Sequence, residues 1–266
     1  MMSDVDVHFD CAESVLSVPA TNGATSSMRS GRTLYGILFE PVRTFDALRG
    51  RPRFVAAAMI IASLTLTLHV LLLRKIGYEN IVRRQIEART QRLDPQQRER
   101  LVQRQLSVPV KALAFISPVF NLAITFALGA VLYLLGALAL GRIITYRQAL
   151  SVWTYSTLPP ATLAMLISIA LVLFQPLDRL GALHGNSGLV LANLSFLVSS
   201  RRQPEMATAL GMLDIFSFYG LFLAALGLRQ VARLSGGAAA AIVLTLWSLS
   251  LIFRVALAAV LGEAMF

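Results

Sequence analysis

Five apolar blocks dominate the sequence, and each is long enough to cross a lipid bilayer as an α-helix. The first, Val55–Leu73, contains 19 residues without a charge and has basic residues on both sides. A hydrocarbon core takes about 20 apolar residues in a helix. The sequence therefore predicts an all-α, polytopic membrane protein whose two ends lie on opposite sides of the membrane. The five predicted spans are residues 55–73, 112–140, 150–174, 207–228 and 237–261.

The composition fits this class and argues against several others. Of the 266 residues, 56% are hydrophobic and 14% are charged, whereas an ordinary soluble domain carries about 25% charged residues. A single cysteine, Cys11, allows neither an internal disulfide nor a cysteine metal cluster, and three histidines leave little for a histidine centre. The net charge is +10, but the basic regions lack interleaved aromatic residues. We therefore expect no metal, no cofactor and no nucleic-acid partner, and we identify no small-molecule substrate.

The chain offers no recognisable catalytic set. The segment Gly185–Gly188 matches the G-x-S-G pattern of rhomboid intramembrane proteases, but a serine nucleophile needs a base such as histidine, and no histidine follows His184. We interpret the segment as a turn, and we treat hydrolysis at Ser187 as the weakest alternative. The phosphate-binding pattern G-x-x-x-x-G-K-[ST] is also absent from the sequence. We expect a protein that is not an enzyme.

The residues before the first span divide into two parts. Residues 1–30 are acidic and rich in small polar side chains, which predicts a disordered tail. Residues 31–53 carry an apolar stripe at helical spacing beside arginines, with a break or restart at Pro41. This pattern predicts an amphipathic helix in the headgroup layer, and the alternative is a helix packed on another domain. The stripe consists of Leu34, Leu38, Val42, Phe45 and Leu48.

A basic helical excursion, residues 76–111, separates the first two spans of the predicted membrane domain 54–266. Tyr78, Val82 and Ile86 form a narrow apolar stripe, and Asp94-Pro95 is typical of a helix start. We therefore predict two helices with a break near residues 93–94. The charges indicate a solvated face, and the alternative is a surface for a partner or for anionic lipid.

Two charged residues lie inside predicted spans, Asp214 in the fourth and Arg254 in the fifth. Each would cost about 2.5–3.5 kcal/mol near the centre of the membrane if left alone. Asp214 lies seven residues after the start of its span and Arg254 seven residues before the end of the next, so both have the same depth in antiparallel helices. We predict an intramembrane ion pair with a structural role. The alternative is a proton or ion relay in a transporter or channel component.

The third span contains two adjacent prolines, Pro159 and Pro160. Together they remove two backbone hydrogen-bond donors from the helix, which predicts a kink at this point.

Three segments resemble the Yip domain of the Ypt/Rab-interacting protein family, which includes many bacterial members. The resemblance covers the chain from Leu34 to its C-terminus. It implies five spans, a cytoplasmic N-terminus and no enzymatic activity. The excursion 76–111 is longer than the first loop of eukaryotic members, and the acidic N-terminal tail is short, so binding of a prenylated GTPase is not implied. The matching segments are Leu38–Leu48 followed by Pro52, Tyr146–Leu150 followed by Ser156–Pro159, and Leu213–Tyr219 followed by Gly227–Arg229.

These observations predict a non-enzymatic membrane scaffold or adaptor, and the alternative is the transporter or channel component that uses Asp214 and Arg254. The expected partners are the lipid bilayer and either other membrane proteins or further copies of the chain. The expected location is the cell membrane, as a multi-pass protein of the bacterial inner membrane. The distribution of basic residues does not decide the orientation, so the cytoplasmic N-terminus rests on the resemblance.

Overall fold

The computed structural model describes residues 30–89, 94–176, 198 and 202–262. These residues form ten helices and no strand, which confirms the all-α class. Five of the helices are long and apolar enough to cross a membrane, as predicted. The expected tail 1–30, the proposed turn at Gly185–Gly188 and the serine within it lie outside the described residues, apart from Ser30.

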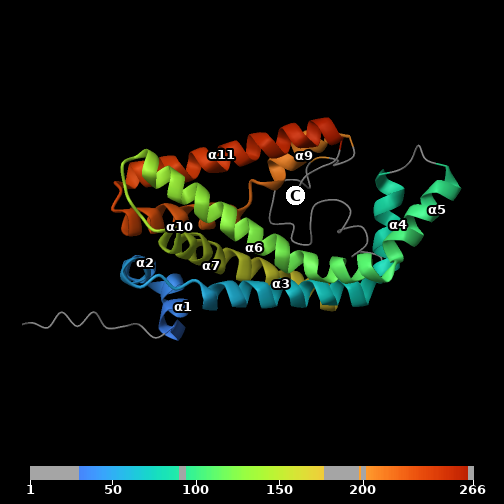
Figure 1. Cartoon of the computed structure of the whole chain (residues 1–266), viewed down its shortest axis with the longest axis horizontal. Helices are drawn as coiled ribbons and strands as arrows, with labels where there is room; N and C mark the ends of the chain where they lie inside the picture. The colour runs from blue at the N-terminus through green and yellow to red at the C-terminus, as the bar shows by residue number, and fades with distance from the viewer. Residues whose placement is uncertain (1–29, 90–93, 177–197, 199–201, 263–266) are drawn as a thin grey trace, which may run out of the picture.

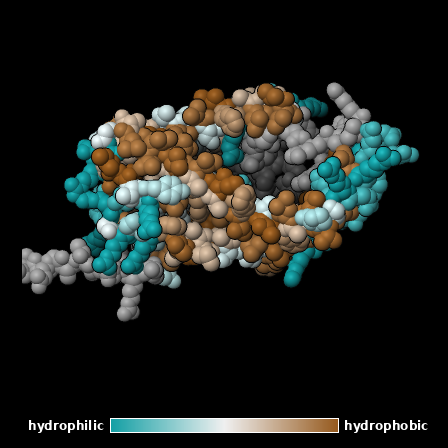
Figure 2. Space-filling model, in the orientation of Figure 1, coloured by the Kyte–Doolittle hydropathy of each residue, from teal (hydrophilic) through white to brown (hydrophobic). Residues whose placement is uncertain are grey.

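The five spanning helices lie side by side and alternate in direction (Figure 1). At 1.5 Å per residue the shortest, α10, is about 27 Å long and the longest, α6, about 48 Å. Figure 2 shows mostly apolar side chains over the middle of the molecule and hydrophilic ones at its two ends, as a bilayer requires. The spans are α3 (Val55–Ile76), α6 (Val108–Ala139), α7 (Tyr146–Phe174), α10 (Ile215–Ala232) and α11 (Gly236–Leu261).

Helix α7 is the central element of the bundle and packs against α3, α6 and α10. Close approach depends on glycine at two points. A Cβ atom on Gly227 of α10 would lie 2.8 Å from atoms of Val152 and Phe45, and a Cβ atom on Gly129 of α6 would lie 2.2 Å from the Trp153 ring. Glycine thus lets α10 approach α2 and α7, and lets α6 approach α7, without a further side chain between them.

Two short helices precede the first span, α1 (Ser30–Phe39) and α2 (Pro41–Gly50), and they meet at the predicted break before Pro41. Phe45 and Leu48 of the apolar stripe are buried in the bundle, whereas Leu38 and Val42 are exposed. The stripe is therefore shared between the protein core and the surface, because α2 packs against α10 and α7. Gln148 of α7 strengthens this contact, since its amide donates a 2.8 Å hydrogen bond to the Arg49 carbonyl.

The excursion forms two helices, α4 (Tyr78–Arg89) and α5 (Pro95–Leu106), which confirms the expected break. The carboxylate of Asp94 accepts a hydrogen bond from the Gln96 amide, as expected of an N-cap, and Pro95 occupies the first helical position. Figure 1 shows this pair of helices at the opposite end of the molecule from α1 and α2.

The fourth predicted span differs from the structure at its start. Instead of one helix from residue 207, a short helix α9 (Pro204–Gly211) ends first, and α10 begins only at Ile215. The reason is local: the Asp214 side chain accepts a hydrogen bond from the Ser217 amide and thereby starts a new helix. The apolar sequence continues across this break, so periodicity alone could not reveal it.

Candidate functional site

A cavity of about 460 Å³ lies between α7 and α10, with one side chain each from α6 and α11. Its volume falls within the range of small-molecule sites, roughly 300–1,000 Å³. Most of the lining is apolar, and polar groups come from a few positions only. Ser156, Thr157, Asp214 and Ser217 supply the aliphatic polar groups, and Tyr133, Trp153, Phe216 and Trp247 supply the aromatic rings.

Asp214 is the only acidic residue among the described lining residues. Its Oδ1 accepts a 2.8 Å hydrogen bond from the Ser217 amide, and its Oδ2 accepts a 2.5 Å bond from the Ser217 hydroxyl. The same side chain therefore caps α10 and faces the cavity.

Pro160 of the proline pair lies in the wall of the cavity, together with other residues of α7. Helix α7 runs without interruption through Pro159 and Pro160, so a bend there stays a prediction. Because neither proline has an amide hydrogen, the carbonyls of Tyr155 and Ser156 lose the donor that an α-helix normally supplies. Opposite them α10 carries Gly220, and a Cβ atom there would lie 3.5 Å from Pro160.

Trp153 lines the cavity and carries a buried hydrogen-bond donor, the indole Nε1, that has no partner among the described residues. Its ring packs against that of Tyr133, with 4.9 Å between the ring centroids and 59° between the ring planes. Buried donors are normally satisfied by protein or water, so this group marks a position where a bound molecule or a water would gain a hydrogen bond.

The structure does not join Asp214 to Arg254. Arg254 is exposed on α11 and is not among the described residues that line the cavity. Ion pairs among the described residues include Arg43–Glu40, Arg83–Glu79 and Arg83–Glu99. Counted from the turn between α10 and α11, both residues lie about 27 Å along their helices, but the structure forms no contact between them. The ion pair stays a prediction.

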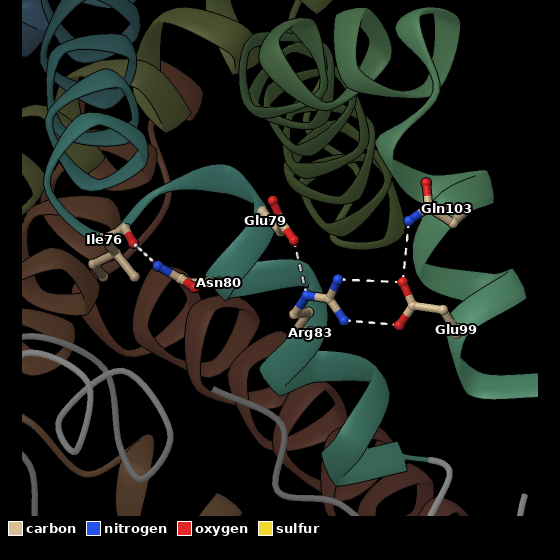
Figure 3. A network of polar contacts seen from close by, with 6 residues as sticks. All are labelled: Ile76, Glu79, Asn80, Arg83, Glu99 and Gln103. Atoms are coloured by element: carbon tan, nitrogen blue, oxygen red, sulfur yellow. Dashed lines mark hydrogen bonds and ion pairs between the residues drawn. The ribbon is translucent and has the colours of Figure 1, made fainter. Parts of the chain in front are cut away.

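A second cluster of polar side chains lies outside the membrane, in the hairpin that α4 and α5 form (Figure 3). Arg83 of α4 donates to Glu79 at 2.9 Å and binds both carboxylate oxygens of Glu99 on α5, at 2.9 and 3.2 Å. Gln103 also donates to Glu99, at 3.0 Å. The hydrogen bonds from Arg83, and to a smaller extent from Gln103, hold the pKa of Glu99 below its usual range. The hydrogen bonds to Glu99, and to a smaller extent to Glu79, raise the pKa of Arg83. Sequence spacing suggested two helices here but not which charges would join them.

One further contact was not predicted. The ammonium group of Lys75, at the end of α3, donates hydrogen bonds to three carbonyl oxygens at the end of α7, namely those of Val172, Leu173 (3.1 Å) and Gln175 (2.8 Å). A cation at a helix C-terminus satisfies carbonyls that lack intrahelical donors and interacts favourably with the helix dipole. In the sequence Lys75 only marked the end of the first span.

The comparison with protein families agrees with this architecture. A family model described as the Yip1 domain matches residues 35–257. This range contains the cavity, the α4–α5 hairpin, four of the five spans in full and most of α11, as well as every segment on which the resemblance was based. No curated protein and no solved structure matches the chain. Because the match extends over well more than half of its residues, the chain belongs to the Yip1 domain family.

Proposed function

We propose that this protein is a non-enzymatic membrane scaffold that recruits partner proteins through its α4–α5 hairpin. The observation that carries the proposal is the link between the two helices, in which Arg83 joins Glu79 on its own helix to Glu99 on the other (Figure 3). A solvated charged segment needs no such cross-link. A segment that presents a fixed surface to a partner benefits from one, because less ordering entropy is lost on binding.

The hairpin also has an apolar centre of its own. Val82 and Ile86 of α4 and Val102 of α5 are buried together. Around this centre Arg84, Arg100 and Arg104 are exposed. An arginine surface of this kind suits an acidic partner, since guanidinium groups bind carboxylates in pairs of hydrogen bonds.

We further propose that the protein lies in the cell membrane, the inner membrane of a bacterium, with its N-terminus in the cytoplasm. The exposed aromatic residues Tyr35 and Phe39 of α1 support contact with the headgroup layer at the cytoplasmic face. Since the hairpin follows a single crossing by α3, it would then lie on the opposite side. The partner would be an acidic domain outside the cytoplasm or another membrane protein that reaches there.

Copurification tests this proposal. The protein is extracted from its own host in native nanodiscs, and bound proteins are identified for the wild type and for a variant with Arg84, Arg100 and Arg104 all changed to Glu. We expect at least one partner to be lost in the variant. A control variant reverses the charge of two exposed arginines elsewhere, Arg142 in the α6–α7 turn and Arg147 in the first turn of α7, and should keep the partner. A wild-type particle without partners would contradict the proposal.

The cavity favours transport as a second candidate function, because Asp214 lines a space within the spanning helices. Under this alternative Asp214 carries a proton or ion. Proteoliposomes with a trapped pH-sensitive dye would then show a proton flux that Asp214→Asn abolishes while expression is unchanged. Equal dye response in liposomes with and without the protein would rule out proton transport.

A further inference from the structure

We propose that the cavity between α7 and α10 binds a primary ammonium group carried on an apolar chain. The ammonium would lie at Asp214, and the chain would follow the wall formed by Pro160, Gly220 and the two tryptophans. This inference is independent of the scaffold proposal, which rests on the α4–α5 hairpin at another part of the molecule.

The charge of the site supports a cation. The two oxygens of Asp214 each accept one hydrogen bond from Ser217, and a carboxylate offers about four acceptor positions in all. Asp214 takes part in none of the ion pairs recorded among the described residues. A half-buried carboxylate with free acceptor positions and no paired cation attracts a donor that is itself charged.

The lining supports an ammonium rather than a bare metal ion. Four aromatic rings face the cavity, and aromatic faces attract organic cations through their negative quadrupole. No group of three or more histidine, cysteine or acidic residues that could hold a metal occurs in the described parts of the chain. Asp214 therefore has no second acidic, histidine or cysteine ligand beside it among the described residues that line the cavity.

The shape of the cavity supports a chain. Gly220 lies opposite Pro160, and the two helices run in opposite directions. Trp153 lies seven residues from that level toward the N-terminus of α7, and Asp214 lies six residues from it toward the N-terminus of α10. Because the helices are antiparallel, these two steps point in opposite directions. The backbone positions of Trp153 and Asp214 are therefore about 20 Å apart along the helix axes. Because Asp214 is at the very start of α10, the ammonium end lies at the edge of this span and the chain runs inward.

The two tryptophans make the site directly measurable. The sequence contains only two, Trp153 and Trp247, and both line the cavity. The full-length protein is placed in phosphatidylcholine nanodiscs and titrated with a primary alkylamine that carries bromine at the end of its chain. Bromine quenches tryptophan fluorescence at short range, so a bound chain should quench it in a saturable manner. The matching brominated alcohol partitions into the lipid without a charge. It should give only weak quenching that rises in proportion to its concentration and does not saturate.

Two variants test the assignment. Asp214→Asn keeps the cap of α10, because asparagine caps helices as well as aspartate does, but it removes the charge. We expect the half-quenching concentration of the amine to rise about tenfold or more, as for loss of a charge-assisted hydrogen bond. Gly220→Leu fills the groove and should abolish saturable quenching, whereas Gly220→Ala, whose added carbon would meet Pro160 at 3.5 Å, should retain it.

Competition distinguishes two sources of the same chemistry. Displacement of the probe by phosphatidylethanolamine, but not by phosphatidylglycerol, would identify a lipid headgroup as the ligand. Displacement by non-brominated alkylamine alone would identify a free amphiphilic amine, and either result supports the site. Equal quenching by amine and alcohol, or an unchanged half-quenching concentration in Asp214→Asn, would overturn it.

Discussion

The ring of Trp153 lies directly over Gly129, so that a Cβ atom on this glycine would be 2.2 Å from two ring carbons. Replacing Gly129 with alanine must therefore displace the indole. We expect a loss of stability of about 1–3 kcal/mol, the usual cost of overpacking a core. Thermal unfolding in nanodiscs, followed by tryptophan fluorescence, measures it. Gly237→Ala is the control, since nothing lies within 4 Å of the added carbon there, and an equal change in both variants would contradict this packing.

Gly227 should be as sensitive to substitution by alanine as Gly129, but through contacts with different side chains. Its added carbon would lie 2.8 Å from side-chain atoms of Phe45 and Val152. We expect Gly227→Ala to loosen α2 from the bundle, which hydrogen exchange of residues 41–50 would show as faster exchange. Adding Val152→Ala removes one of the two clashes and should restore part of the protection. No recovery in the double variant would mean that Val152 is not the obstacle.

Lys75 is expected to hold the end of α7. In Lys75→Met three carbonyls at the end of α7 lose this donor, and those of Val172 and Gln175 are part-buried. A buried polar group left unsatisfied costs about 1–3 kcal/mol. We predict a lower unfolding temperature and faster hydrogen exchange at the last turn of α7. The neighbouring exposed residue provides the control, because Arg74→Met removes the same charge at almost the same position.

The α4–α5 hairpin should loosen in acid. Its hydrogen bonds with Arg83 and Gln103 hold the pKa of Glu99 below the usual value. A carboxyl group with a lowered pKa in the folded state stabilises that state above its unfolded pKa, about 4.3 for glutamate, and loses this contribution as the pH falls through the folded value. Arg83 stays charged throughout and adds no pH dependence. The protection of residues 78–89 against hydrogen exchange, measured relative to the intrinsic exchange rate at each pH, should therefore be constant near neutral pH and lower in acid.

Arg83→Gln removes the cause of this pH dependence. The variant should show faster exchange in the hairpin already at neutral pH and a smaller further change in acid. Arg84→Gln alters an exposed arginine next to it and should behave as the wild type. A wild-type acid response in Arg83→Gln would assign the effect to another carboxyl group.

The relation between Asp214 and Arg254 can be settled by a double-mutant cycle. Because the structure forms no contact between them, the effects of Asp214→Asn and Arg254→Met on stability should add. Coupled residues deviate from additivity by about 0.5–3 kcal/mol. A coupling energy in that range would restore the ion pair expected from the sequence.

The sequence alone was sufficient to predict the five crossings and the two helices of the hairpin, because both follow from local patterns. Apolar length marks a span, and Asp94-Pro95 marks a helix start. The break before α10 was missed because residues 210–213 are apolar, and only the position of the Asp214 side chain reveals the cap.

The remaining features depend on contacts between distant residues. Lys75 reaches carbonyls about a hundred positions later in the chain, and Gly129 matters only because Trp153 lies against it. The cavity likewise requires α10 to meet α7 at the proline pair. A single sequence gives no signal for such pairings, although Gly227 already belonged to a segment of the family resemblance.

The most direct test is the sidedness of the hairpin, since the account places α4–α5 and the α10–α11 turn on opposite faces of the membrane. Cys11 is the only cysteine, so a Cys11→Ser background accepts single cysteines at Gln96 and Ser235, both exposed. In intact spheroplasts an impermeant maleimide should label Gln96→Cys at once and Ser235→Cys only after the membrane is permeabilised. Labelling of both positions from the same side would contradict the five-span arrangement, and the reverse pattern would contradict the cytoplasmic N-terminus.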